Sequence, residues 1–209
     1  MKIAVHADAL VPPRKRDREA SRRLLIDAGI ELFSTLGYEA ATTKAIATLA
    51  GFNEQLITRY FGGKAGLLAA VYLDFIERRE NDALYALEPL SHDASEEIRR
   101  FMVFKHRHIA DIEKLLRIVM PQIILDPSLL PMINDPSVLR GAVVLADRLR
   151  ALQATGAIRA DADLRRIATL VVWQSISLSF LMRHMSGGRD GEVLRLIEIF
   201  AITLGSGLG

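Results

Sequence analysis

Residues 42–61 read TTKAIATLAGFNEQLITRYF, and this stretch predicts two short helices joined by a tight turn. Thr42 or Thr43 can cap the first helix, because a side-chain hydroxyl can accept from the free amides of an opening helical turn. Gly51 permits the positive φ that a sharp helix exit usually needs. Asn53 is a good cap for the second helix. The stretch therefore predicts a helix-turn-helix unit.

Apolar spacing assigns an inner face to both helices. In the first helix the inward residues recur at helical spacing and are Ala45, Ile46, Leu49 and Ala50. In the second, Ile57 and Phe61 are four apart and point inward together, with Phe52 anchoring the turn. The residues left facing outward are Glu54, Gln55, Thr58 and Arg59. A short helix with a polar, hydrogen-bonding outer face is what the major groove of DNA accepts.

Further spacings match on both sides of this unit. They begin with RLLIDAGIELF at 23–33, continue through LGY at 36–38 and end with YFGGKAGLL at 60–68. At these residues the chain resembles the tetracycline-repressor (TetR) family of bacterial transcription regulators. The resemblance covers about the first third of the chain. The rest is similar to the family only in being helical and of suitable length.

Hydrophobic periodicity predicts an all-α fold of about nine helices, with no repeat and no convincing strand pattern. Together with the resemblance, it implies a three-helix helix-turn-helix head on a larger helical body. We expect a disordered basic arm at 1–16, the DNA-binding domain at 17–63, and a ligand-binding and dimerisation domain at 64–209. The arm could lie in a minor groove, although a solvated tail is the favoured alternative.

The expected helix bounds outside the helix-turn-helix follow from capping residues and breakers. A proline-rich segment at 126–136 should be irregular, and Pro121 should kink its helix. The first expected helix spans 17–35, and Gly37 terminates it. A further helix begins at 95, and another runs from 161 or 163 to 185. The remaining expected helices span 64–87, 112–125, 137–154 and 190–204.

The expected helix ending at 185 is apolar nearly all round, so it needs one partner inside its own subunit and another outside. We therefore expect a homodimer in which this helix and the one at 190–204 form a four-helix bundle across a two-fold axis. Leu178 in the middle of the first of these helices is a candidate interface residue.

The amino-acid composition limits the cellular compartment and the class of protein. Of 209 residues, 50% are hydrophobic and 25% are charged, which supports a sizeable core in a soluble protein. The absence of cysteine excludes a disulfide scaffold and fits a reducing cytosol. The start lacks a signal-peptide core, and the longest uncharged run, 167–182, is shorter than the roughly 20 residues of a membrane span. We expect a cytoplasmic protein without a membrane partner.

Charge adds a weaker indication. The formal net charge is only +2, but residues 1–66 carry ten Lys and Arg against seven Asp and Glu. Residues 67–209 carry 17 against 18. The positive excess therefore lies with the helix-turn-helix, where phosphates would be contacted. Ordinary scatter explains a difference of this size equally well.

The resemblance assigns DNA contacts residue by residue. It implies that Lys44 reaches a base or a phosphate, and that base edges are read by Glu54, Gln55 and Leu56. It implies phosphate contacts, which fix register, for Thr43, Thr58, Tyr60 and Lys64. Arg59 could do either. The chain departs from the family in having Gln55 where a small residue is usual, and Thr58 where a longer-reaching Tyr is usual. Packing roles stay open for Leu56 and Tyr60.

Catalysis and metal binding find little support. No nucleophile stands beside a base, and there is no Gly-rich phosphate loop, so we expect no enzyme and no cofactor. His106 and His108 point apart on a helix because they are two residues apart. His108 and Asp111 have a spacing that would permit a shared metal ion, but a surface or pocket histidine is the favoured interpretation and no metal is expected.

The body contains candidates for a ligand cavity. The apolar and aromatic ones are Phe101, Phe104, Met120 and Trp173, and the possible polar anchors are His108, Arg117 and Gln174. These imply a mainly hydrophobic effector with one or two polar groups, although a plain filled core is the commoner fate of such residues.

The prediction is a ligand-responsive transcription regulator, with repression favoured, that binds palindromic double-stranded operator DNA as a dimer and leaves it when a small molecule binds. The alternatives are a helical carrier or enzyme with a vestigial head, and a nucleoid-type protein that binds DNA by shape.

Overall fold

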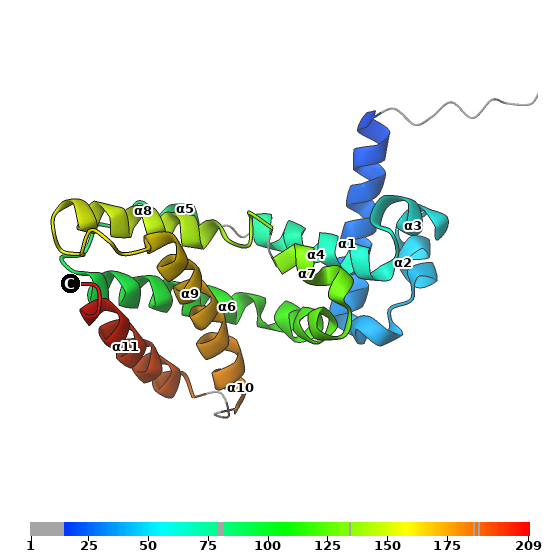
Figure 1. The fold of residues 1–209 in the computed structure, drawn as a ribbon. Helices are drawn as coiled ribbons and strands as arrows, with labels where there is room; N and C mark the ends of the chain where they lie inside the picture. The colour runs from blue at the N-terminus through cyan, green and yellow to red at the C-terminus, as the bar shows by residue number, and fades with distance from the viewer. Residues whose placement is uncertain (1–14, 79–81, 134, 186, 188) are drawn as a thin grey trace, which may run out of the picture. The chain divides into compact units, whose positions relative to one another are not determined.

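The computed structural model describes residues 15–209 except 79–81, 134, 186 and 188 (Figure 1). Every regular element among these residues is helical, which confirms the expected all-α fold. The expected basic arm at 1–16 lies almost wholly outside the described residues. The chain divides into two compact units, Met1–Leu67 and Leu68–Gly209, and each is treated by itself.

The first unit is built from α1 (Lys15–Ala40), α2 (Thr43–Leu49) and α3 (Gln55–Phe61). Helical backbone breaks at Gly37, where φ is 79°, and a further helical turn follows that the sequence did not predict. Completely buried side chains hold the three helices together, because apolar surface removed from water stabilises their packing; they include Leu25, Phe33, Ile46 and Ile57.

Local chemistry shapes the α2–α3 turn as expected. The Thr42 hydroxyl accepts from the amide of Ala45 at 3.1 Å, and Gly51 has φ of 78°. The Asn53 carboxamide oxygen accepts from the amide of Gln55 at 2.9 Å and so caps α3. The prediction that Leu49 faces inward is wrong, since 47% of it is exposed. The inner face of this seven-residue helix falls instead on Ile46 and Ala47.

Helix α4 spans Lys64–Arg78, and residues 79–81 of the expected helix 64–87 lie outside the described part of the chain. The remaining elements are α5 (Asp82–Tyr85), α6 (Ala94–Leu125), the 3-10 turn η1 (Pro127–Leu129), α7 (Leu130–Ile133), α8 (Arg140–Ala154), α9 (Leu164–Ile176), the π-helical segment η2 (Ser177–Met182), α10 (Arg183–Met185) and α11 (Asp190–Ser206). The second unit comprises these elements and α4 from Leu68 onward.

Helix α6 corrects one expectation. It is one helix of 32 residues where two were expected, and Pro121 lies inside it, as expected. No glycine or proline interrupts the sequence from Ala94 to Met120, so the helix has no reason to stop there. The segment expected to be irregular contains η1 and α7.

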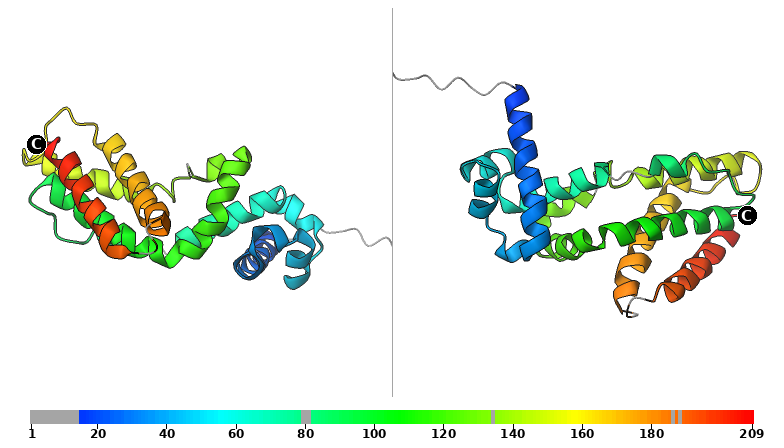
Figure 2. Two further views of the ribbon diagram at one scale, coloured as in Figure 1. Left: turned by 90° about the horizontal axis from the view of Figure 1, so that it is seen from below. Right: turned by 180° about the vertical axis from the view of Figure 1, so that it is seen from behind.

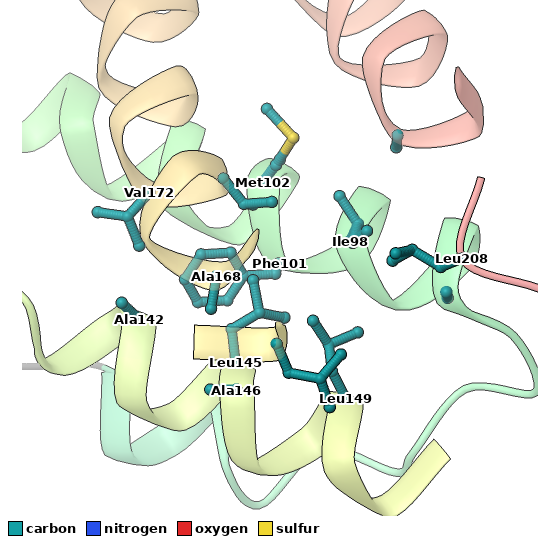
Figure 3. Close-up of a cluster of buried hydrophobic side chains, with 14 of the residues drawn as sticks. Ile98, Phe101, Met102, Ala142, Leu145, Ala146, Leu149, Ala168, Val172 and Leu208 are labelled. Atoms are coloured by element: carbon teal, nitrogen blue, oxygen red, sulfur yellow. The ribbon is translucent and has the colours of Figure 1, made fainter. Parts of the chain in front are cut away.

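The core of the second unit lies among α6, α8, α9 and α11, as Figure 3 shows for side chains such as Phe101, Leu145 and Val172. Helix α11 runs beside α6 in both views of Figure 2. Gly205 permits this approach, because a Cβ added there would lie 2.5 Å or less from atoms of Ser95, including its backbone nitrogen. A side chain at this position would push the two helices apart.

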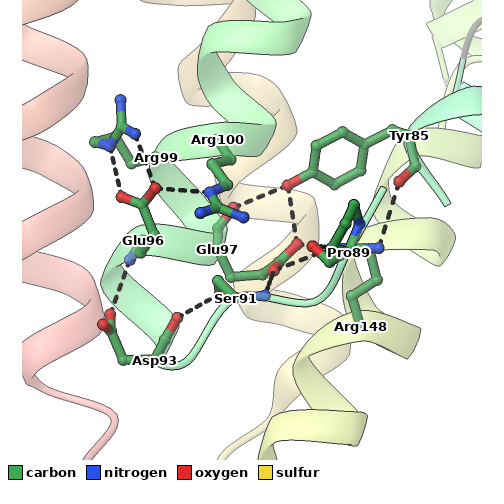
Figure 4. Close-up of polar contacts among 9 residues, drawn as sticks. All are labelled: Tyr85, Pro89, Ser91, Asp93, Glu96, Glu97, Arg99, Arg100 and Arg148. Atoms are coloured by element: carbon green, nitrogen blue, oxygen red, sulfur yellow. Dashed lines mark hydrogen bonds and ion pairs between the residues drawn. The ribbon is translucent and has the colours of Figure 1, made fainter. Parts of the chain in front are cut away.

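A buried ion pair joins α6 to α8 (Figure 4). The Arg148 guanidinium donates to both carboxylate oxygens of Glu97 and to the carbonyl oxygens of Glu88 at 2.7 Å and Pro89 at 3.0 Å. The Tyr85 hydroxyl donates to Glu97 at 2.9 Å. Burial raises the pKa of Glu97, but the hydrogen bonds from Arg148, Ser91 and Tyr85 outweigh burial, and the pKa lies below its ordinary value.

No helix among the described residues combines the length and apolarity needed to cross a bilayer. No group of three or more His, Cys, Asp and Glu side chains is gathered there in a way that would hold a metal ion. The side chain of Asp111, the expected companion of His108, lies outside the side chains that the structure describes.

Candidate nucleic-acid interface and ligand cavity

The exposed face of α3 is polar. Gln55, Thr58 and Arg59 are exposed on it, and Glu54 is exposed directly before it. Ile57 on the opposite face is completely buried, which fixes the rotation of this short helix. Leu56 is half-buried between the two faces. The helix therefore presents donors and acceptors that can reach base edges while its apolar side holds it on the unit.

Helix α2 meets this face through a side-chain hydrogen bond. The Thr43 hydroxyl donates to the carboxylate of Glu54, so both residues are engaged with each other. The bond holds the Glu54 carboxylate beside α2. Lys44, next to Thr43, is exposed. An exposed cation at this position is accessible to a DNA phosphate.

Two arginines of α1 contact Tyr60 and Phe61 at the C-terminal end of α3. Arg22 donates to the carbonyl oxygen of Tyr60 at 3.0 Å, and its guanidinium lies 4.6 Å from the centre of the Phe61 ring. Arg18 lies 5.6 Å from the centre of the Tyr60 ring. Neither arginine was predicted from the sequence to position α3. Their signal was the spacing of four on α1, which places them on one face.

Lys64 is half-buried rather than freely solvated. Its ammonium donates to the carbonyl oxygen of Glu39 at 3.2 Å and lies 4.3 Å from the centre of the Tyr38 ring. It therefore ties the start of α4 to the end of α1 within the first unit. A phosphate contact by this residue would add to a role in local structure.

The second unit contains a partly open cavity of about 40 Å³. Its apolar wall comes from α4, α6, α9 and the turn before α8, and consists of Ile76, Ile109, Ile112, Leu116, Val138, Val172 and Ile176. Five polar side chains interrupt this wall: Tyr72, Asp82, Lys105, His108 and Ser137. The arrangement of a mainly apolar lining with a few polar groups is typical of small-molecule sites.

An ion pair lies in the cavity wall. The Lys105 ammonium is 2.9 Å from one carboxylate oxygen of Asp82 and 3.3 Å from the other, and the two side chains are only 13% and 10% exposed. Tyr72 is 3% exposed, and burial raises the pKa of its hydroxyl to about 12. Gly141 makes room for the pair, since a Cβ there would lie 2.9 Å from an Asp82 oxygen.

Of the seven predicted ligand residues, His108 lines this cavity and the other six do not. Phe101 is completely buried in the core, and Phe104 packs on Tyr85 with ring centres 5.2 Å apart. Arg117 is 59% exposed and paired with Glu113. The other three are half-buried elsewhere: Met120, Trp173 and Gln174. The lining residues Asp82 and Ser137 were not predicted, because their place in the wall depends on segments that are far apart in the sequence.

Taken together, the first unit has the form of a helix-turn-helix domain, and the whole chain falls in the class of all-α helix-turn-helix proteins. Residues 25–71 match the family model described as "Bacterial regulatory proteins, tetR family". The HTH-type transcriptional regulator BetI of Escherichia coli is 33% identical over 85 residues. That alignment spans 41% of this chain and 44% of BetI, so it covers less than half of either protein.

Solved structures extend the similarity to the fold of the body. FadR from Bacillus subtilis in complex with stearoyl-CoA matches with a TM-score of 0.59 and 22% identity, over 90% of this chain and 99% of that one. A transcriptional regulator from Saccharomonospora viridis in complex with choline matches with a TM-score of 0.58 and 20% identity, over 87% and 95%. By these matches residues 25–71 are similar in sequence to the TetR family, and the chain as a whole shares the fold of these solved regulators.

Proposed function

We propose that this protein is a ligand-responsive transcriptional repressor that binds palindromic operator DNA as a homodimer and is released by a small, mainly hydrophobic effector. The observation that carries the proposal is the exposed polar face of α3 on a unit that matches the TetR family model. Base reading is assigned to Glu54, Gln55 and Leu56, with Lys44 or Arg59 reaching a base or a phosphate. Phosphate contacts are assigned to Thr43, Thr58, Tyr60 and Lys64.

Dimerisation is supported by apolar side chains that the second unit leaves exposed. On η2 and α10, Leu181 is 54% and Met185 is 81% exposed. On α11, Ile199 is 61% and Ile202 is 53% exposed. Exposed apolar side chains on η2, α10 and α11 can form an association surface, because burying them in a second copy removes this area from water. The expected interface residue Leu178 is buried inside its own subunit and is not part of this surface.

An effector site in the cavity of about 40 Å³ would couple binding to conformation. Drug-sized ligands occupy cavities of roughly 300–1,000 Å³. A ligand must therefore widen this cavity, and it binds better to a conformation in which α4, α6 and α9 have moved apart. Differential affinity of this kind is what shifts a two-state equilibrium. Helix α4 contributes Tyr72 and Ile76 to the cavity wall, which supports a role for this helix in the proposed response.

The test is selection of tight-binding duplexes from a random pool by the purified full chain, followed by affinity measurements at several salt concentrations. We expect an inverted repeat with half-site centres about one helical turn or slightly more apart. Specific binding should exceed nonspecific binding by about 10³-fold or more. Uniform binding to all duplexes would indicate a protein that recognises DNA shape, and negligible binding would indicate a carrier with a vestigial head.

A further inference from the structure

The ion pair in the cavity wall has no net charge. Lys105 and Asp82 neutralise each other, and both side chains are largely withdrawn from water. A buried ion pair is stable only while each charge keeps its partner, because an uncompensated buried charge is expensive. A ligand with a charge of its own would compete with one member and leave the other member uncompensated.

The pair nevertheless retains hydrogen-bonding capacity. An ammonium group has three N–H donors and a carboxylate has about four acceptor positions. Two contacts join Lys105 to Asp82, and neither side chain has another hydrogen bond to a described residue. A hydroxyl group can both accept from the ammonium and donate to the carboxylate without disturbing their charge balance.

Tyr72 adds a second polar group to the same wall. It is 3% exposed and lines the cavity, and no described residue forms a hydrogen bond with its hydroxyl. Burial alone accounts for the rise in its pKa, so the group stays neutral at physiological pH. A hydroxyl that lines the cavity and has no partner among the described residues is available to a ligand that supplies one.

We propose that the cavity selects an uncharged, mainly apolar molecule carrying a hydroxyl group, which the Asp82–Lys105 pair and the Tyr72 hydroxyl recognise in place of a carboxylate or an ammonium. The inference rests on the proposed function in taking this cavity as the effector site. It goes further in assigning the polar recognition to residues on α4, α5 and α6 and in excluding ionic effectors.

Calorimetric titration of the full chain without DNA, using one apolar body with four end groups, tests this. The probes are para-propylbenzyl alcohol, para-propylbenzoate, para-propylbenzylammonium and propylbenzene. We expect the alcohol to bind the wild-type protein at least about tenfold more tightly than each of the others. A charged probe that binds as tightly as the alcohol, or no binding by any probe at millimolar concentration, would overturn the inference.

Two charge-removing variants give a readout that a merely structural role would not produce. Asp82→Asn leaves the ammonium without its counterion, so preference should shift toward the benzoate. Lys105→Gln leaves the carboxylate, so preference should shift toward the benzylammonium. Tyr72→Phe should weaken the alcohol without changing the order of the charged probes. Lys114→Gln, an exposed lysine on the same helix, is the matched control and should leave the ranking unchanged.

If the single variants fail to fold, the inference is tested by the wild-type ranking of the probes and by the double variant Asp82→Asn/Lys105→Gln, which preserves charge balance. If the single variants fold but do not shift their preference toward oppositely charged probes, the assignment of the pair is contradicted. Operator binding by the ligand-free protein is measured separately. Specific DNA binding with no hydroxyl preference overturns this inference alone, whereas a hydroxyl preference without specific DNA binding overturns the proposed repressor.

Discussion

Gln55 is the exposed side chain at the start of α3 that is best suited to read a base. A glutamine carboxamide can form two hydrogen bonds with one adenine edge, and alanine can form neither. We predict that Gln55→Ala costs about 1–3 kcal/mol of operator affinity at a single base position and relaxes preference there. Binding to operators substituted at each position measures this.

Lys64→Ala is the matched comparison, because a phosphate contact is independent of sequence. It should weaken all duplexes about equally and reduce the salt dependence of binding. Since Lys64 also contacts Glu39 and Tyr38, the variant should lower the melting temperature of the protein as well. If Gln55→Ala and Lys64→Ala both leave operator affinity unchanged, α3 is not the reading helix.

Residue-level prediction from sequence succeeds where the determinant is local. The Thr42 cap, the positive φ of Gly51 and the buried Ile57 depend on neighbours within a few residues. It fails where the determinant is distant. The Arg22 contact with Tyr60 joins residues 38 positions apart, and the Lys105–Asp82 pair joins residues 23 apart. No helical period encodes either contact.

At the scale of the elements, Gly205 on α11 lies very close to Ser95 on α6, and we expect this contact to be important for stability. We predict that Gly205→Ala destabilises the protein by about 1–3 kcal/mol, because the new methyl group meets backbone atoms that cannot move away cheaply. Equilibrium denaturation with urea measures the change in the free energy of unfolding.

Gly191→Ala is the control on the same helix. A Cβ there meets no atom within 4 Å, and alanine has the higher helix propensity. We expect an unchanged or slightly raised stability. Equal effects of Gly191→Ala and Gly205→Ala would show that helix propensity, rather than the α6–α11 contact, sets the outcome.

Among elements, sequence predicted which segments are helical better than where helices end. The bounds of α8 and α11 lie within three residues of expectation, since glycine and capping residues mark their ends. The sequence did not reveal that α6 is a single helix, since separate helices were expected from residue 95 and over 112–125. Pro121 lies inside a helix, as predicted.

At the scale of the whole molecule, the exposed apolar side chains of α11 predict the assembly. We expect a dimer at micromolar concentration and predict that Ile199→Glu shifts it to a monomer, because a charge buried without a partner is costly. Sedimentation velocity measures the mass. Leu87→Glu, at a leucine that is 80% exposed outside this surface, should leave the dimer intact.

Leu178→Glu is not an informative test of assembly, since Leu178 belongs to the core and its substitution tests folding. If wild-type protein sediments as a stable monomer, or if Ile199→Glu and Leu87→Glu behave alike, α11 is not the interface.

Acid stability follows from the buried Glu97–Arg148 pair. The folded pKa of Glu97 lies below its ordinary value, so its contribution is complete above that ordinary value and is lost as the pH falls through the folded pKa. We predict that Glu97→Gln costs about 3–5 kcal/mol at neutral pH, because the buried Arg148 loses its counterion. The variant should also lose less stability on acidification than the wild type.

Urea denaturation at a series of pH values measures both effects. Glu96→Gln is the comparison, since Glu96 pairs with Arg99 and Arg100 near the surface, and Arg99 lowers its pKa to about 2. An exposed pair contributes less than about 1 kcal/mol, so this variant should stay close to wild type at neutral pH. Equal losses in the two variants would contradict a special role for the buried pair.

The single long helix α6 constrains how this protein can diverge. At a rise of about 1.5 Å per residue, its 32 residues extend for about 48 Å. Glu97 fixes one end to α8, Ser95 fixes it against α11, and Lys105 lies further along in the cavity wall. A descendant that adopts a new effector can exchange side chains on this helix, but it cannot shift the backbone without disturbing the rest of the body. Specificity should therefore evolve by substitution on α6, while insertions and deletions should accumulate in the connections around it.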